Sequence, residues 1–140
     1  MSYRVPFVNF SAQYRAHKDE YDEAITKCLE NGKLILQEDV DQFEENLAKR
    51  LGFKYAVGVA DGTNAIILAL KALGTEGRCI WVSDYTFKAT HEAVKHTGNH
   101  PMYRDVDKNR LAEPPNTSDN IPVHIEGMVA EVNEYSLLED

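Results

Sequence analysis

The stretch that decides the fold is Lys54-Tyr-Ala-Val-Gly-Val-Ala-Asp-Gly-Thr-Asn-Ala-Ile-Ile-Leu-Ala-Leu-Lys71. Its residues 55–60 form a short apolar run, which is typical of a parallel strand that is covered on both faces. Asp61-Gly62 interrupts the run, and a helix is predicted to begin at Thr63 or Asn64. The helix residues are apolar on nearly every side, which is typical of a core helix. We therefore predict a strand, a tight turn and a buried helix.

The predicted turn around Gly62 and Thr63 has the chemistry of an anion site. A strand that leads through glycine into a helix directs free backbone N–H groups toward the carboxyl end of the sheet. The helix dipole favours negative charge at the same place. From these residues alone, a phosphate site and a simple strand-to-helix turn both remain open.

The segments before this stretch predict two amphipathic helices. The first runs from Ser11 to about Leu29 and is followed by the stop signal Asn31-Gly32. The second runs from Glu38 to Leu51, with acidic residues in its first turn and basic residues in its last. That charge order complements the helix dipole, so this acidic face needs no functional explanation.

The segments after it predict alternating strands and helices. Strands are expected at 79–83 and 100–104, with a helix from about residue 88 to 97 between them. Such βαβ units give an α/β protein with a mostly parallel sheet and helices in layers on its faces. Residues 105–120 are polar and contain Pro114-Pro115, which indicates a loop. Residues 121–125 and 136–138 are predicted as further strands.

Length and composition restrict the class of protein. The 140 residues suffice for one domain, which we expect to span 1–140. A net charge of −8 argues against nucleic acid or an anionic membrane as a partner. The two cysteines match no metal or disulfide framework, and there is neither a signal-peptide core nor a membrane-spanning run. We expect a cytoplasmic protein.

Several blocks, taken in order, resemble the amino-terminal part of the DegT/StrS-type sugar aminotransferases, which depend on pyridoxal phosphate. The matching blocks are Val5-Pro-Phe-Val-Asn-Phe10, Gln13-Tyr14, 29–36 with Val40 and Phe43-Glu44, Ala56-Val-Gly-Val59 with Gly62-Thr63, Tyr85-Thr-Phe-Lys-Ala-Thr90, Asp105-Val-Asp107, Ile121-Pro-Val-His124 and Leu138-Glu-Asp140. Each block is weak alone, but together they span nearly the whole chain. The resemblance implies a truncated, aspartate-aminotransferase-like (fold type I) large domain with three α/β/α layers.

The resemblance also assigns roles to four residues. Gly62 and Thr63 are expected to hold the cofactor phosphate through backbone N–H groups and the Thr63 hydroxyl. Phe87 is expected to stack on the pyridine ring, and Asp140 to pair with the pyridine nitrogen. The family works on nucleotide-linked keto sugars, usually as homodimers. Without such a role, Phe87 would be a core aromatic residue and Asp140 a solvated chain end.

The chain also departs from the family pattern. The lysine that holds the cofactor covalently follows the position of Asp140 in the family, so no catalytic residue is assigned here. Asp61 stands where a small uncharged polar residue is usual, and Met128 stands where many members have glutamine. The segments 107–120 and 128–136 are shorter than the corresponding segments of the family. His124 either lines the site or is a packed strand histidine.

Two hypotheses follow from these observations. The chain is an amino-terminal fragment of a sugar aminotransferase, which is expected to be inactive by itself without the lysine, or it is a stand-alone protein that kept the fold core as an anion-binding or interaction module. A reading frame that continues beyond Asp140 and encodes the missing lysine favours the first hypothesis, and a stop codon there favours the second.

Overall fold

The computed structural model describes residues 5–32, 34–35, 38–108, 111–116 and 118–140. The chain divides into two compact units, Met1–Gly58 and Val59–Asp140. The expectation of one domain over the whole chain stays a prediction. Residues 33 and 36 of the predicted linker lie outside the described residues.

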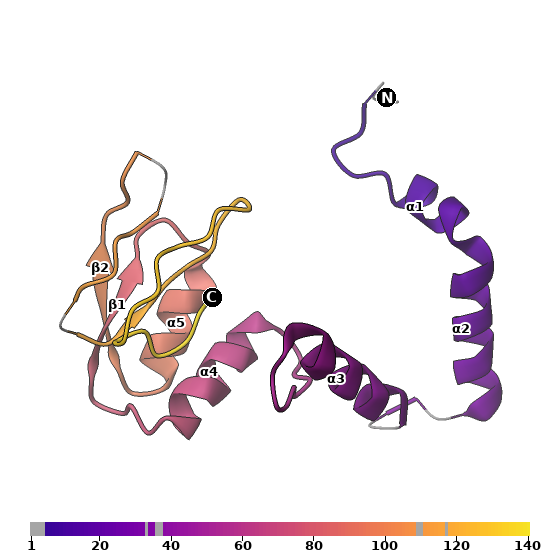
Figure 1. The fold of residues 1–140 in the computed structure, drawn as a ribbon, viewed down its shortest axis with the longest axis horizontal. Helices are drawn as coiled ribbons and strands as arrows, with labels where there is room; N and C mark the ends of the chain where they lie inside the picture. The colour runs from indigo at the N-terminus through magenta and orange to yellow at the C-terminus, as the bar shows by residue number, and fades with distance from the viewer. Residues whose placement is uncertain (1–4, 33, 36–37, 109–110, 117) are drawn as a thin grey trace. The chain divides into compact units, whose positions relative to one another are not determined.

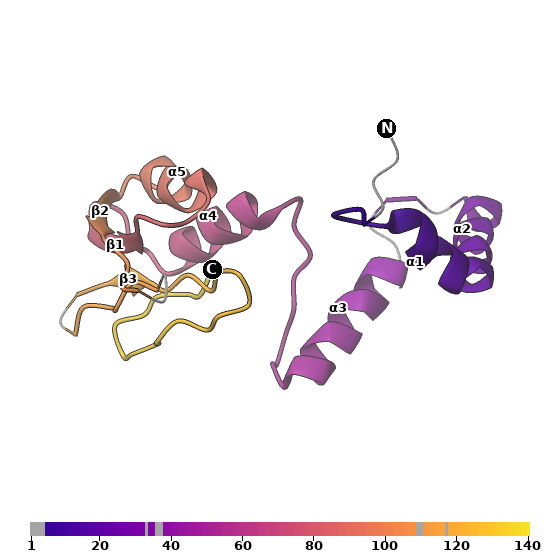
Figure 2. The same ribbon diagram turned by 90° about the horizontal axis from the view of Figure 1, so that it is seen from above.

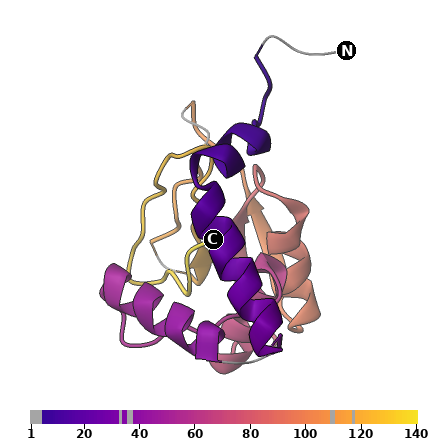
Figure 3. The same ribbon diagram turned by 90° about the vertical axis from the view of Figure 1, so that its right-hand side faces the viewer.

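The first unit contains three helices, α1 (Phe10–Ala16), α2 (Lys18–Asn31) and α3 (Glu38–Leu51). The prediction of one helix from Ser11 to Leu29 is wrong, because the chain bends at His17 between α1 and α2 (Figure 3). The His17 backbone leaves the helical region, with φ −129° and ψ 27°. Asn9 rather than Ser11 caps α1, since its side-chain oxygen accepts a hydrogen bond from the Ala12 N–H at 3.0 Å.

The helix α3 has the predicted bounds, and the stop signal after α2 is confirmed. Gly32 ends α2 in the left-handed conformation, with φ 64°. Among the described residues of this unit, Ala48 of α3 is the only buried one. The apolar side chains of α2 and α3 therefore remain largely exposed, among them Ile25, Leu29 and Phe43.

The strand predicted at residues 55–60 is absent, so that prediction is wrong. The segment forms no ladder with any described strand, and the Val57 side chain is 77% exposed. The Gly58 N–H instead donates to Glu44 Oε1 at 2.6 Å. The run has the composition of a buried strand, but a strand also needs neighbours whose backbone groups pair with its own. The described chain supplies none.

The second unit is built on a parallel sheet of the order β2-β1-β3. Its strands are β1 (Cys79–Ser83), β2 (His100–Arg104) and β3 (Asn120–Ile121). Cys79 pairs with His100, and Trp81 pairs with Asn120. The predicted α/β class, parallel sheet and first two of these strands are confirmed. The strand predicted at 121–125 is shorter, because Pro122 has no N–H to continue the ladder, and the strand at 136–138 is reduced to one bridge at Ser136.

Two helices, α4 (Gly62–Ala72) and α5 (Lys88–His96), cover one face of this sheet (Figures 1 and 2). Their apolar sides form one core with β1 and β3, made of Ile66, Leu70, Ile80, Val82, Ala93, Val94 and Ile121. Leu137 and Leu138 pack against the same core. The end of the chain is thereby held against the body of the unit. The central pair of helix and strand residues, Leu70 and Ile80, is 0% exposed.

A buried polar cluster ties the ends of α4 and α5 to the start of the sheet. The Asn99 side-chain amide donates to Thr75 Oγ1 at 3.0 Å and to Thr97 Oγ1 at 2.8 Å. Its oxygen accepts from the Arg78 N–H at 3.1 Å. Because these groups are shielded from water, each needs such a partner.

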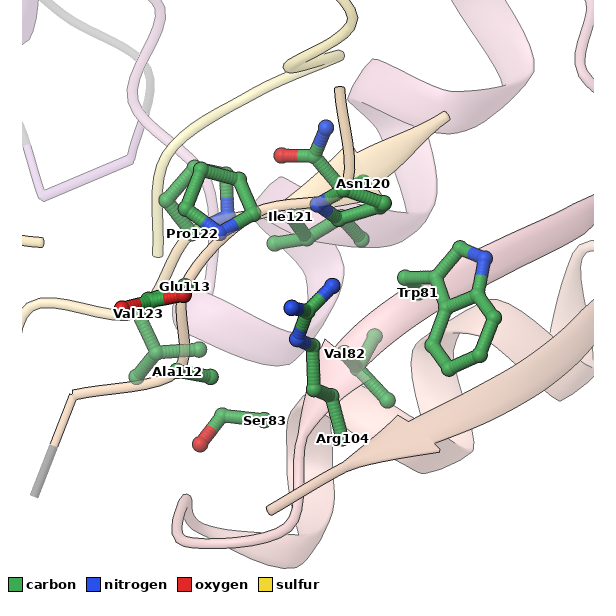
Figure 4. A pocket seen from close by; sticks show the side chains of 12 residues that line it. Trp81, Val82, Ser83, Arg104, Ala112, Glu113, Asn120, Ile121, Pro122 and Val123 are labelled. Atoms are coloured by element: carbon green, nitrogen blue, oxygen red, sulfur yellow. The ribbon is translucent and has the colours of Figure 1, made fainter. Parts of the chain in front are cut away.

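The opposite face of the sheet is covered by loop segments. A small hollow lies there, lined by Trp81, Val82, Ser83, Arg104, Ala112, Glu113, Pro114, Pro115 and residues 120–123. In Figure 4 the Arg104 side chain points toward β3 across this hollow. The described part of 105–119 contains no helix, which confirms the predicted loop. No helix among the described residues has the length and apolar character needed to cross a bilayer.

Candidate functional site

The first turn of α4 carries Gly62 and Thr63, but its cap is Asp61. The Asp61 carboxylate accepts from the Asn64 N–H at 2.8 Å and from the Asn64 side-chain amide at 3.0 Å. The helix therefore begins before the predicted start at Thr63 or Asn64. Asp61 also places a negative charge at the turn for which the sequence predicts an anion site. Gly62 faces open space, since a Cβ at this position would meet nothing within 4 Å.

Phe87 lies where the segment after β1 enters α5. It is the N-cap residue of α5 in extended conformation, with φ −69° and ψ 141°. Its backbone oxygen accepts from the Thr90 N–H at 3.2 Å. The ring is 73% exposed, so core packing does not account for it within this chain. An exposed aromatic face at the carboxyl end of a parallel strand is available for stacking on a planar ligand.

Asp140 is exposed, as expected of a solvated chain end, but hydrogen bonds hold it in place. Its N–H donates to Pro122 O at 2.9 Å, and its carbonyl oxygen accepts from the His124 N–H at 2.8 Å. Its side-chain Oδ2 accepts a hydrogen bond from Thr90 Oγ1 on α5. The residue is thus fixed by both its backbone and its carboxylate, beside the first turn of α5.

Both ring nitrogens of His124 are engaged in local contacts. Nδ1 accepts from the Ala130 N–H at 3.0 Å, and Nε2 lies 2.8 Å from Glu139 Oε2. Because Nδ1 accepts a hydrogen bond, Nε2 carries the ring hydrogen and donates a hydrogen bond to Glu139 Oε2. His124 is therefore used to hold the last segment of the chain, and these contacts favour the packed-histidine interpretation.

The structure brings two of the four predicted residues into one neighbourhood. Phe87 and Asp140 are linked through Thr90, which contacts both. Among the described residues, no hydrogen bond joins Gly62 or Thr63 to this pair. Sequence reasoning assigned no role to Thr90, although it ends one of the matching blocks, because its partner Asp140 is 50 residues away. It also missed the capping role of Asp61, although aspartate is a strongly favoured N-cap residue.

Comparison with known proteins identifies the relatives of this chain. The model of the DegT/DnrJ/EryC1/StrS aminotransferase family matches residues 15–139. The UDP-N-acetyl-3-dehydro-alpha-D-glucosamine 3-aminotransferase of Acidithiobacillus ferrooxidans is 34% identical over 138 residues, which is 91% of this chain and 37% of that protein.

Solved structures agree with this relationship. DesV of Streptomyces venezuelae superposes with a TM-score of 0.84 at 30% identity, over 93% of this chain and 38% of that one. The ntda protein of Bacillus subtilis, solved with bound PMP, the amino form of the cofactor, gives a TM-score of 0.72 at 27% identity, over 89% and 31%. The chain therefore spans between about 31% and 38% of the length of these relatives. These relatives confirm the predicted fold class.

Proposed function

Because the chain belongs to the DegT/DnrJ/EryC1/StrS aminotransferase family, we propose that it is the amino-terminal part of a pyridoxal-phosphate-dependent aminotransferase that acts on a nucleotide-linked keto sugar. The observation that supports this most is the fixed Asp140 carboxylate beside Phe87. The relatives are sugar aminotransferases by name, and one was solved with the cofactor bound. A homodimer and a cytoplasmic location belong to the same proposal.

The residues present fit the ring end of the cofactor better than its phosphate end. Asp140 offers its second carboxylate oxygen, Oδ1, to a ring N–H, and Phe87 offers an exposed aromatic face. When bound, the cofactor supplies a protonated pyridine ring that acts as an electron sink. At the phosphate end, Gly62 leaves room, whereas the Asp61 carboxylate already occupies the donors of Asn64.

The phosphate end yields a first prediction. Asp61→Asn removes the negative charge and keeps a side-chain oxygen for the cap, so affinity for pyridoxamine phosphate is expected to rise by about tenfold. Equilibrium dialysis of both chains with pyridoxamine phosphate measures this change. Asp19→Asn, which changes an exposed aspartate in the first turn of α2, serves as the control that removes a charge elsewhere. Equal affinity of Asp61→Asn and the original chain would show that Asp61 does not oppose the phosphate.

The expectation that residues 1–140 contain no cofactor-bonding lysine yields a second prediction. The chain by itself is expected to catalyse no transamination, and borohydride treatment with pyridoxal phosphate is expected to label several exposed lysines weakly. Peptide mass spectrometry after reduction identifies the labelled residues. Stoichiometric labelling of a single lysine would contradict the prediction, because it would reveal a cofactor-bonding lysine within residues 1–140.

A second candidate function, a non-catalytic interaction module, is favoured by the exposed apolar side chains of the first unit. Phe7, Leu34 and Ile35 are 105%, 68% and 76% exposed, and only Ala48 is buried among the described residues of this unit. Exposed apolar surface of this extent marks an interaction site. Binding of pyridoxamine phosphate distinguishes the two functions, since the aminotransferase proposal expects it and the module does not need it.

A further inference from the structure

We propose that Thr90 is a positioning residue, which aims the Asp140 carboxylate at the ring nitrogen of the cofactor, with Thr86 as its support. The inference rests on the proposed function, because it concerns the same site. It adds two residues whose hydroxyl groups touch neither cofactor nor substrate and act only through Asp140.

The direction of the hydrogen bonds follows from the chemistry of the groups. The Asp140 carboxylate is acceptor-only when ionised, so Thr90 Oγ1 must donate to Oδ2. Thr90 has one hydroxyl proton, which this bond uses. In the 3.0 Å contact between the two threonines, Thr86 therefore donates and Thr90 accepts. The chain of bonds runs in one direction, from Thr86 through Thr90 to Asp140.

The setting of Thr90 makes this bond a means of orientation. Thr90 is 1% exposed, so water does not compete for its hydroxyl. Two backbone hydrogen bonds, at 2.9 and 2.8 Å, already place Asp140 between Pro122 and His124. The Thr90 bond then selects the direction of the side chain, with Oδ2 bound to α5 and Oδ1 left for the ring N–H.

The same turn of α5 also carries the stacking residue. The Thr90 N–H donates to Phe87 O at 3.2 Å, so Thr90 holds Phe87 through its backbone and Asp140 through its side chain. The amino end of a helix also favours a negative charge in its first turn. The first turn of α5 therefore holds both groups that would contact one pyridine ring: Phe87 at its face and Asp140 at its nitrogen.

The test compares Thr90→Val, which keeps the shape and removes the hydroxyl, with Thr90→Ser, which keeps the hydroxyl. Each chain is titrated with pyridoxamine phosphate and with an analogue in which C–H replaces the ring nitrogen. Thr90→Val is expected to lower the affinity for pyridoxamine phosphate by about tenfold, the effect of losing a hydrogen bond to a charged group. Its affinity for the analogue is expected to stay unchanged, and Thr90→Ser is expected to restore binding.

A second readout needs no cofactor. The ¹³C chemical shift of the Asp140 side-chain carboxylate is expected to move in Thr90→Val and to return in Thr90→Ser. Thr97→Val is the control: it changes the buried threonine at the opposite end of α5, whose hydroxyl donates to Ala93 O and Val94 O. The Asp140 carboxylate shift is expected to stay unchanged in this variant.

Three outcomes overturn the inference. Equal losses for pyridoxamine phosphate and its analogue would mean that Thr90 acts on stability alone. An unmoved Asp140 carboxylate shift in Thr90→Val would mean that the bond is absent. No binding of pyridoxamine phosphate by the original chain would overturn the proposed function, and the inference with it. The first two leave the proposed function intact, so the failures are distinguishable.

Discussion

Replacing Leu70 with alanine is expected to lower the free energy of unfolding of the second unit by about 3 kcal/mol. Leu70 is 0% exposed and packs in the core between α4 and the sheet. The substitution removes buried methyl groups and leaves a cavity, because the strand β1 cannot move inward to close it. Urea titration of the full chain, followed by far-ultraviolet circular dichroism, measures the loss as a lower midpoint with an unchanged slope.

Leu68→Ala is the matched control for this prediction. Leu68 lies on the same helix and is 52% exposed, so its replacement creates no closed cavity. We expect its free energy of unfolding to change by less than about 1 kcal/mol. If the two variants lost equal stability, α4 would not face the sheet through Leu70, and the described core would be wrong.

Asn99→Ala is expected to lower the free energy of unfolding of the second unit by about 2 kcal/mol. The side chain of Asn99 supplies three hydrogen bonds, to Arg78 N, Thr75 Oγ1 and Thr97 Oγ1. Its loss removes three hydrogen bonds from a cluster that is shielded from water, while Thr75 Oγ1 and Thr97 Oγ1 keep their hydrogen bonds to backbone carbonyl oxygens. The same urea titration applies, and hydrogen exchange of the Arg78 amide is expected to quicken in the variant.

Asn116→Ala provides the comparison for this cluster. Asn116 is exposed, and within the described residues its side-chain oxygen accepts one long contact, at 3.5 Å, from the Asn133 side-chain amide. A change within about 0.5 kcal/mol is expected for this surface position. A cost of Asn99→Ala as small as that of the control would mean that the buried cluster contributes nothing to stability.

Local sequence patterns were sufficient to predict the elements whose start and end signals lie within or next to their own residues. The helix α3 carries its apolar stripe, its charge order and the following Gly52, the strand β1 is an apolar run, and β2 follows the glycine stop after α5 at Gly98. Their types and bounds were therefore predictable. His17 shows the opposite case, because no glycine or proline marks the bend between α1 and α2.

Residues 55–60 show what pattern alone does not determine. Their alternation of apolar and small residues indicates a buried strand, yet burial and pairing depend on neighbours that lie elsewhere in a fold. In this chain Val57 and Tyr55 are 77% and 74% exposed. The relatives are roughly three times as long, so the family pattern is present here without the described partners that such a strand needs.

The candidate site was predictable in its residues and not in its contacts. Ordered blocks of sequence pointed to Phe87 and Asp140, because those blocks resemble a known family. The bond from Thr90 to Asp140 joins positions 50 residues apart, and only the packing of Leu137 and Leu138 on the core brings them together. In the sequence Asp61 interrupts the apolar run, and in the structure its carboxylate caps α4.

The most direct test of the cofactor site is a titration of the ¹⁵N-labelled chain with pyridoxamine phosphate, followed by ¹H–¹⁵N correlation spectra. Saturable shifts are expected for the amides of Phe87, Thr90 and Asp140, with smaller shifts at Gly62 and Thr63. Absence of any saturable shift, or shifts confined to α1, α2 and α3, would contradict the proposed cofactor site.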